Sequence, residues 1–378
     1  MQLISKLPKI GTTIFTTMSK MAMEYNAINL AQGFPNFPVN ERLLELTQET
    51  IRENSHQYAP MAGHPLLLDQ LALLTNNSYG RVVDPNSEIL VTAGATQAIF
   101  TTIQALIHTS DEVVILDPSY DCYAPAVSLS GGIPVHVSLT DSFLPDWSEI
   151  KAKCNSRTRM ILINNPHNPS GRIFQESDIK SLENVLESFP KIILLSDEVY
   201  EYITFEQKHI SVNTRAKLLN RAVIISSVGK TFHITGWKIG YLIAPEFIMK
   251  EIKKVHQYLV FSVNSVAQIT LSKYLQEVDV TQLGAYYQQK RNLFSDLIKG
   301  SRFILLPSEG SYFQTVSFAP ISDKNDVLFC EDLIKNYGVA AIPLSVFNES
   351  KKDNKVIRFC FAKDQQTLEL AAKKLCRI

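Results

Sequence analysis

The middle of the chain alternates short apolar runs with segments that carry a helical pattern. The run Glu88–Thr92 precedes apolar residues that recur at helical spacing, and further helix-like segments lie near Tyr123–Leu129 and from about Glu176. The runs are continuous instead of alternating with polar residues, which is typical of strands buried on both faces. They read EILVT, EVVILDP, PVHVSL, RMILINNP, KIILLSDE, AVIISSV and KIGYLIAP. This pattern predicts an α/β fold, with a mostly parallel sheet between helices.

The pattern changes after Ala244. A long helical region is expected over 246–276 and a second helix over 283–298, followed by two strands around a glycine turn in FILLPSEGSYFQTVSF. A helix near 330–336, the strand VIRFCF and a helix over 366–375 complete the chain. These elements predict a smaller α+β layer, which the segment before about Asn40 joins. We therefore expect an arm and part of the small domain in 1–45, a large domain in 46–284 and a small domain in 285–378.

Composition and charge exclude several classes of protein. The chain has 378 residues, equal numbers of acidic and basic side chains, and no repeats, so it offers no basic field for nucleic acid. Its five cysteines are odd in number and form no CxxC pair, which argues against a disulfide framework or a zinc site and favours a reducing cytoplasm. The start of the sequence lacks the apolar core of a signal peptide, and no stretch is apolar enough to span a membrane.

The stretch SSVGKT follows an apolar strand and ends like a nucleotide-binding loop. A P-loop would place its first glycine at position 224, where this chain has Ile224, so the glycine-rich cradle is missing. Alone, Lys230 is then a solvated loop lysine. Ser227 and Lys238 change that interpretation, because a hydroxyl and a second cation would neutralise a phosphate ester beside a reactive amine.

Acidic residues end another strand, in SDEVYEYI. Asp197 is either a helix cap or solvated turn, or a buried carboxylate at the carboxyl end of a central strand, where open α/β sheets bind ligands. In the second case it can hold a proton on a heteroaromatic nitrogen, with Tyr200 within reach of the same ring.

Three further motifs each have a structural and a functional interpretation. NNPHNPSGR is a plain loop or a stiff support for the amide of Asn168. GATQA, Gly94–Ala98, is an ordinary strand-to-helix turn or a phosphate-binding helix N-terminus. Arg358 in the apolar strand VIRFCF forms an internal salt bridge or grips a carboxylate with both arms of its guanidinium.

Taken in order, these motifs resemble one family. GATQA, DPSYDCY, NNPHNPSG, SDEVYEY, SSVGKTFHITGWKIG and VIRFCF resemble the pyridoxal-phosphate aminotransferases of fold type I, class I/II, over the whole chain from LAQGFPNFP. QYAPMAGHPLL, VHQYLVFSVN and AAIPLSVF are most similar to the bacterial methionine aminotransferases and to the kynurenine aminotransferase/glutamine transaminase group. The resemblance implies a seven-stranded sheet, pyridoxal 5'-phosphate as cofactor, and a homodimer with shared active sites.

The resemblance also assigns roles around the cofactor ring. Lys230 matches the lysine that forms a Schiff base with the cofactor, and Asp197 the acid that pairs with the pyridine nitrogen. Tyr200 and Asn168 match the groups that hydrogen-bond the 3-oxygen, and Tyr120 the aromatic residue stacked on the ring.

The phosphate is expected on backbone N–H groups of Ala95 and Thr96 and on Ser227 and Lys238. Tyr58 matches a tyrosine that reaches the phosphate from the other subunit. Many class I members have arginine at the position of Lys238, and lysine there is common in the kynurenine and methionine branch.

For the substrate, Arg358 matches the arginine that binds the α-carboxylate, helped by Asn168 and the backbone near Gly33. The side-chain pocket is expected to be aromatic, some of it from the partner subunit, although any of these residues could instead be core. Its candidate residues are Phe15, Phe34, Tyr58, Tyr123 and Phe261. No second arginine is evident for a distal carboxylate, so we expect a neutral, methionine-like or aromatic amino acid.

The implied activity is transfer of an amino group to a 2-oxo acid by a ping-pong Schiff-base mechanism. A cysteine-S-conjugate or cystathionine-type β-lyase would use the same cofactor residues, and is the alternative. A regulator that binds the cofactor without catalysis is disfavoured, because too few residues precede LAQGF for a DNA-binding domain.

Overall fold

A seven-stranded sheet forms the centre of the larger part of the computed structural model, which describes residues 3–8, 10–53 and 56–378. Its strand order is β2-β8-β7-β6-β5-β3-β4, and β8 alone runs against its neighbours β2 and β7. The strands are β2 (Ile89–Thr92), β3 (Glu112–Asp117), β4 (Ile133–Ser138), β5 (Thr158–Asn164), β6 (Ile193–Asp197), β7 (Ala222–Ser226) and β8 (Gly240–Ile243). The predicted mostly parallel sheet is confirmed.

Successive residues of each central strand enter opposite cores. In β3, Val113 and Ile115 pack with α4 (Ala95–Leu106), α5 (Tyr123–Leu129) and α10 (Glu246–Leu259), whereas Val114 and Leu116 pack on the other side. That side is covered by α6 (Trp147–Lys153), α7 (Glu176–Ser188) and α8 (Ala216–Leu219), and near β2 and β8 by α2 (Glu41–Arg52), α3 (Pro65–Tyr79) and α11 (Ser265–Tyr274). Two apolar faces explain the continuous runs. The edge strand β4 is the exception, since most of it is partly exposed.

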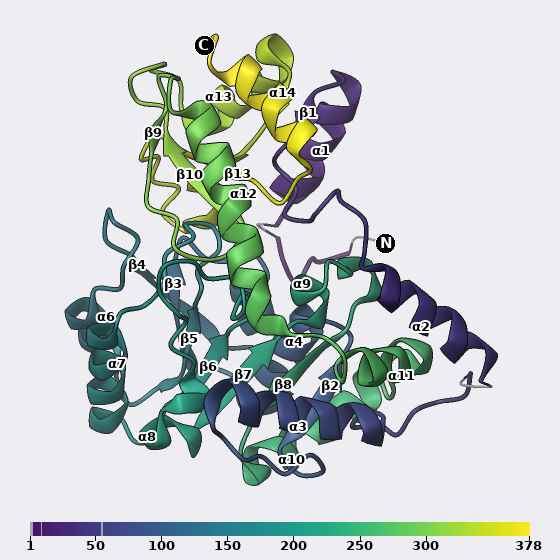
Figure 1. Cartoon of the computed structure of the whole chain (residues 1–378). Helices are drawn as coiled ribbons and strands as arrows, with labels where there is room; N and C mark the ends of the chain where they lie inside the picture. Colours follow the sequence, from purple (N-terminus) through teal and green to yellow (C-terminus); the bar gives the residue numbers. More distant parts are fainter. Residues whose placement is uncertain (1–2, 9, 54–55) are drawn as a thin grey trace.

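A smaller layer lies above this sheet in Figure 1. Its antiparallel sheet has the order β12-β13-β10-β9, and α12 (Leu283–Ile298) and α14 (Gln365–Leu375) pack together beside it. The strands are β9 (Ile304–Leu305), β10 (Phe313–Ser317), β12 (Ile342–Pro343) and β13 (Val356–Cys360). The predicted pair of strands around Gly310 is confirmed by the antiparallel pairing of β9 with β10.

The N-terminal segment joins this smaller layer. The strand β1 (Ile28–Asn29) pairs in parallel with β11 (Val339–Ala340), and α1 (Ile14–Glu24) contributes Met18 and Ala22 to the same core. This pairing joins residues about 310 positions apart, so it places the following residues, 30–37, beside the small sheet. The domain division at 45/46 and 284/285 stays a prediction, and the ranges it uses include residues 1, 2, 9, 54 and 55, which lie outside those described.

The structure changes the bounds of two predicted helical regions. The region expected over 246–276 is helical but divided in two, because Phe261 adopts a left-handed backbone with φ of 66° and Asn264 caps a new helix by accepting from the N–H of Ala267 at 2.8 Å. The helix expected over 330–336 starts earlier, as α13 (Asp326–Asp332), because the side chain of Asn325 caps it. A five-residue π-helical turn, Leu333–Tyr337, then follows.

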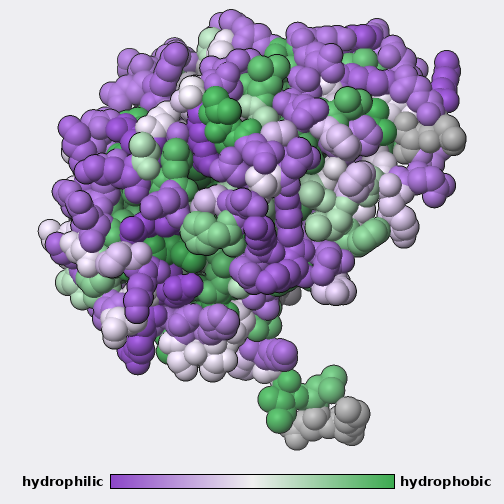
Figure 2. Space-filling model, turned by 90° about the horizontal axis from the view of Figure 1, so that it is seen from below, coloured by the Kyte–Doolittle hydropathy of each residue, from purple (hydrophilic) through white to green (hydrophobic). Residues whose placement is uncertain are grey.

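The surface carries hydrophobic side chains in patches within a largely hydrophilic exterior, as Figure 2 shows for the face seen from below. Across the described part of the chain, none of the helices combines the length and the hydropathy that crossing a membrane requires.

Candidate active site

A cavity of about 340 Å³ lies at the carboxyl ends of the central strands, under the small layer. It brings together the residues that the sequence motifs single out from eight separate segments. The predicted residues that line it are Phe15, Gly33, Phe34, Ala95, Thr96, Tyr120, Tyr123, Asn168, Asp197, Tyr200, Ser227, Lys230, Lys238 and Arg358. We call the part formed by Lys230, Asp197, Ser227, Lys238 and the start of α4 the cofactor end, and the part formed by Arg358, Phe15, Gly33 and Phe34 the substrate end.

Asp197 is the last residue of β6 and is almost completely buried. Its Oδ2 accepts a hydrogen bond from the Tyr123 hydroxyl at 2.6 Å, and its Oδ1 accepts from the backbone N–H of Val199 at 3.3 Å. Burial raises the pKa of this carboxyl to about 6, although both hydrogen bonds favour the charged form. The cap or solvated-turn interpretation is therefore excluded, because the carboxylate faces a buried site.

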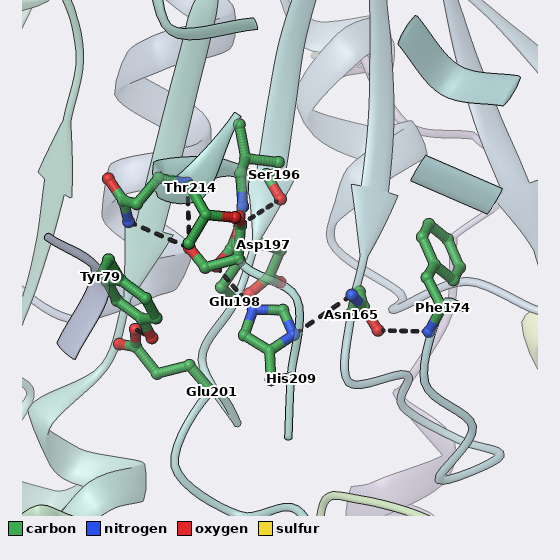
Figure 3. A network of polar contacts seen from close by, with 12 residues as sticks. Tyr79, Asn165, Phe174, Ser196, Asp197, Glu198, Glu201, His209 and Thr214 are labelled. Carbon is green, nitrogen blue, oxygen red and sulfur yellow. Dashed lines mark hydrogen bonds and ion pairs between the residues drawn. The ribbon is translucent and has the colours of Figure 1, made fainter. Parts of the chain in front are cut away.

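Figure 3 shows a polar network behind this strand end. Glu198, which follows Asp197, accepts from the Ser196 hydroxyl at 2.9 Å and lies 2.7 Å from Nε2 of His209. The other ring nitrogen of His209 lies 3.2 Å from the Asn165 amide. The network holds the ends of β5 and β6 together from outside the cavity, so it fixes where Asp197 points.

Lys230 lies in the single-turn helix α9 (Val228–Thr231), directly after β7. Its Nζ donates to the carbonyl of Gly33 at 3.4 Å and lies 5.8 Å from the ring centroids of Tyr200 and Tyr312. Burial lowers the pKa of the Lys230 amine to about 8, with Arg358 and Lys238 adding to this and Asp197 opposing it. An amine with such a pKa is partly neutral near pH 7, as a Schiff-base nucleophile requires.

The start of α4 lies against Lys238. Gly94 precedes the helix with φ of 79°, and a Cβ there would lie 3.3 Å from Nζ of Lys238. A Cβ on Gly240 would lie 2.9 Å from the backbone nitrogen of Ala95. Both glycines therefore allow a close approach that leaves the first N–H groups of α4 beside Ser227 and a cation. These groups form an anion-binding cradle at a helix N-terminus.

Arg358 is the largest fully buried side chain among the described residues. One terminal nitrogen donates to Oδ1 of Asn168 at 2.7 Å and the other to the carbonyl of Ala31 at 3.0 Å, while Nε has no partner. Its guanidinium carbon lies 3.9 Å from the ring centroid of Phe313. The described residues give it no carboxylate partner, so the internal salt bridge is excluded. A buried guanidinium without an acid is suited to an incoming carboxylate.

Asn168 links the two ends of the cavity. Its Oδ1 accepts from Arg358, and its backbone N–H donates to Oδ1 of Asn164, whose own amide donates to the carbonyl of Asp197. Because its oxygen is occupied, the amide nitrogen of Asn168 is left as a fixed donor at the cavity. Tyr200 also lines the cavity and is buried, and burial raises the pKa of its hydroxyl, which therefore stays protonated as a donor.

Two predicted residues lie outside this cavity. Tyr58 and Phe261 are 81% and 49% exposed and contact each other edge to face, with ring centroids 5.3 Å apart. The role of Tyr58 at the phosphate of the other subunit and the role of Phe261 in the substrate pocket stay predictions.

The structure also adds residues that the motifs did not indicate. The Tyr312 hydroxyl donates to the Gly33 carbonyl at 2.7 Å, and the Tyr312 ring packs edge to face on Tyr200. Lys363 donates to the carbonyl of Phe34 at 2.7 Å. Neither has a local signal, because each acts on a segment about 280 to 330 residues away in the sequence.

The chemistry of these donors fits pyridoxal phosphate. The cofactor end offers an amine of lowered pKa, a buried carboxylate, two hydroxyl or amide donors and an anion cradle, which match its aldehyde, ring nitrogen, 3-oxygen and phosphate.

Comparison with known proteins defines the class. The sequence matches the family Aminotransferase class I and II over residues 25–375, so the chain belongs to this family and is a pyridoxal-phosphate-dependent amino acid aminotransferase.

Two members of this family are similar to the chain over nearly its whole length. The chain is 46% identical to the methionine aminotransferase of Escherichia coli over 375 residues, which are 98% of this chain and 97% of that protein. It is 31% identical to rat kynurenine–oxoglutarate transaminase 1, covering 98% and 96% of the two chains.

Solved structures agree with the sequence relatives. An E. coli protein with a methionine aminotransferase function superposes with a TM-score of 0.98 at 45% identity over the whole of both chains. N-succinyldiaminopimelate aminotransferase from Mycobacterium tuberculosis superposes at 0.95 with 30% identity, again over the whole of both chains. The predicted fold type I architecture is confirmed.

Proposed function

We propose that the chain moves the amino group of an L-amino acid with a neutral side chain, of which methionine is the preferred example, to a 2-oxo acid. One observation carries this proposal: the substrate end holds one guanidinium, that of Arg358, and otherwise presents aromatic rings, Phe15 and Phe34 among them. A distal carboxylate would meet no second arginine among the cavity-lining residues described. The relatives named for methionine and kynurenine support the same choice.

At the substrate end, Arg358 binds the α-carboxylate. Its free Nε and terminal nitrogens provide paired donors, and the rings of Phe313 and Phe15 on the guanidinium exclude water. The bonds to Asn168 and Ala31 fix the guanidinium before the substrate arrives. Binding the carboxylate here orients the Cα–H bond toward Lys230.

At the cofactor end, pyridoxal phosphate supplies the electrophilic carbon and the electron sink. Lys230 would hold it through its Nζ amine, and the same amine would take the Cα proton of the substrate and return it. Asp197 holds a proton on the ring nitrogen, because its carboxylate is buried and already held by Tyr123. Asn168 and Tyr200 would donate to the 3-oxygen, and Tyr120 would contact the ring. The N–H groups of Ala95 and Thr96, with Ser227 and Lys238, bind the phosphate.

The assembly and the location are part of the same proposal. A homodimer with shared active sites is supported by the exposed aromatic pair Tyr58 and Phe261, which lies beside the exposed Tyr258 and Leu259 at the break between α10 and α11. A cytoplasmic location is supported by five cysteines that are all free. We also propose the domain boundaries at 45/46 and 284/285.

A donor panel tests the substrate proposal. Purified protein loaded with cofactor is mixed with methionine, phenylalanine, glutamine or aspartate, and the cofactor absorbance is followed without a 2-oxo acid. We expect the second-order rate constant of this half-reaction to be about 100-fold higher for methionine than for aspartate, because a distal carboxylate would be buried unpaired. Faster reaction of aspartate would contradict the proposal. Ammonia and pyruvate released from a cysteine conjugate would instead indicate the β-lyase.

A further inference from the structure

The segment 31–36, which we call the strap, forms one wall of the substrate end. Gly33 and Phe34 line the cavity, and Phe34 is 45% exposed at its mouth. The strap has no regular secondary structure, so its position is fixed by side chains from elsewhere in the chain. Arg358 donates to the carbonyl of Ala31 and Tyr312 to that of Gly33. At the far end Asn36 exchanges two hydrogen bonds with Asp364, one to the carboxylate and one from the backbone N–H.

Lys363 holds the middle of the strap. Its Nζ donates to the carbonyl of Phe34 at 2.7 Å and to that of Gln32 at 3.4 Å, and lies 5.0 Å from the Phe34 ring centroid. The side chain is only 4% exposed, and the described residues give its ammonium no ion pair with a carboxylate. Burying an ammonium on carbonyl oxygens alone is costly, so a neutral apolar residue would pack here at lower cost. The charged side chain instead provides a hydrogen bond to each of two strap carbonyls, those of Phe34 and Gln32.

The geometry points to Lys363 as a specificity-determining residue. We propose that it fixes Phe34 as the apolar wall for the outer part of the substrate side chain, and so sets the preference for long neutral side chains. It lies outside the cavity and does not touch the reacting atoms, so it acts through Phe34 as a positioning residue. The inference rests on the proposed function, since it names the part of the same site that distinguishes substrates by the length of their side chain.

A series of donors measures this effect. Alanine, 2-aminobutyrate, norvaline, norleucine and methionine are compared in the loaded full-length enzyme, with one saturating 2-oxo acid. In Lys363→Met we expect kcat/KM to fall about 10-fold for norleucine and methionine, chiefly through KM, and by less than about 2-fold for alanine, which is too short to reach Phe34. Lys363→Arg keeps a cation and donors and should restore part of the preference.

A matched control variant distinguishes the loss of Phe34 positioning from a general destabilisation of the small layer. Lys355 also donates to two backbone carbonyls of the small layer, those of Asp323 and Lys324, but neither of these two residues lines the cavity. Lys355→Met should leave the dependence on chain length unchanged. Equal losses for alanine and norleucine in Lys363→Met, or no loss for either, would overturn the inference.

Phe34→Ala provides a second route that does not depend on how Lys363→Met folds. Because Phe34 is half-exposed, its truncation should be tolerated. Phe34→Ala should lower kcat/KM for norleucine and methionine but not for alanine, as Lys363→Met does. Adding Lys363→Met to Phe34→Ala should then cost little more, since a residue acting through Phe34 has nothing left to position. Fully additive losses would overturn the inference. If the wild type uses norleucine but not methionine, the proposed function fails while the series still tests Lys363.

Discussion

The two ends of the cavity are built in different ways. At the cofactor end, Asp197, Ser227 and Lys230 sit at or directly after the ends of parallel strands, and a helix N-terminus completes the site. At the substrate end, the strap comes from the N-terminal segment and is held by hydrogen bonds from side chains of the small layer. A sheet fixes its strand ends through many backbone bonds, so the first arrangement tolerates little variation. The second can change wall residues without disturbing the chemistry.

The largest expected effect comes from removing the reactive amine at the cofactor end. Lys230→Ala should lower kcat by about 10⁴-fold, because the covalent link and the proton transfer are both lost. Activity and the absorption band of covalently bound cofactor are measured together. Lys253→Ala is the control, since Lys253 also donates to a backbone carbonyl, that of Asn86, but lies outside the cavity lining. A covalent absorption band that survives in Lys230→Ala would contradict the assignment.

The next effect should appear at the substrate end alone. Arg358→Met fills the buried position with an apolar side chain but removes the guanidinium that binds the substrate α-carboxylate. The value of kcat/KM should therefore fall about 10²- to 10³-fold for every amino acid. The cofactor absorbance should remain that of the wild type. Loss of bound cofactor together with activity would show that the two ends are not separable in the way the structure indicates.

A smaller effect should follow from one hydroxyl at the cofactor end. Tyr123→Phe removes the hydrogen bond to Oδ2 of Asp197, and a hydrogen bond to a charged group is worth enough to lower kcat about 10-fold. Tyr287→Phe is matched to it, because the buried Tyr287 hydroxyl also has one side-chain partner, Nδ1 of His233 at 2.8 Å, outside the cavity lining. Equal kcat values for the two variants would show that Tyr123 does not support Asp197.

This contrast explains what the sequence could predict. The continuous apolar runs indicate the buried strands, and polar motifs directly after them, such as SDEVYEY and SSVGKT, place Asp197 and Lys230 at one edge of the sheet. The cofactor end could therefore be predicted from local patterns. Tyr123 was expected to contact substrate, and it does line the cavity, but its bond to Asp197 spans 74 residues and has no local signal.

The substrate end was harder to predict because its supports are long-range. Tyr312 and Lys363 reach the strap from about 280 to 330 residues away, and no spacing in the sequence reveals such contacts. The break after α10 was missed for a different reason. The apolar pattern continues through Val260 and Phe261, while the left-handed backbone at Phe261 and the cap at Asn264 end one helix and begin another.

The smallest expected effect couples the two ends through charge. The pKa of the Lys230 amine in the apo-protein is about 8, below its ordinary value, and the Arg358 cation contributes to that lowering. The neutral amine is the reactive form, so the rate at which apo-protein captures pyridoxal phosphate should rise with pH through about 8. Removing the cation in Arg358→Met should move this midpoint upward and slow capture a few-fold near pH 7.5.

The ratio of the capture rates of wild type and Arg358→Met at each pH isolates the titration of Lys230, because titration of the cofactor itself affects both proteins equally.

The lowered pKa of Lys230 also makes the stability of the folded protein depend on pH. A lysine whose pKa is lowered in the folded protein stabilises the folded state at pH values above its ordinary pKa of 10.5. This contribution is lost as the pH falls through about 8. Wild-type apo-protein should therefore lose stability toward acid in that window, and Arg358→Met should lose less of it. An unchanged capture midpoint in Arg358→Met would mean that the two ends are electrostatically independent of each other.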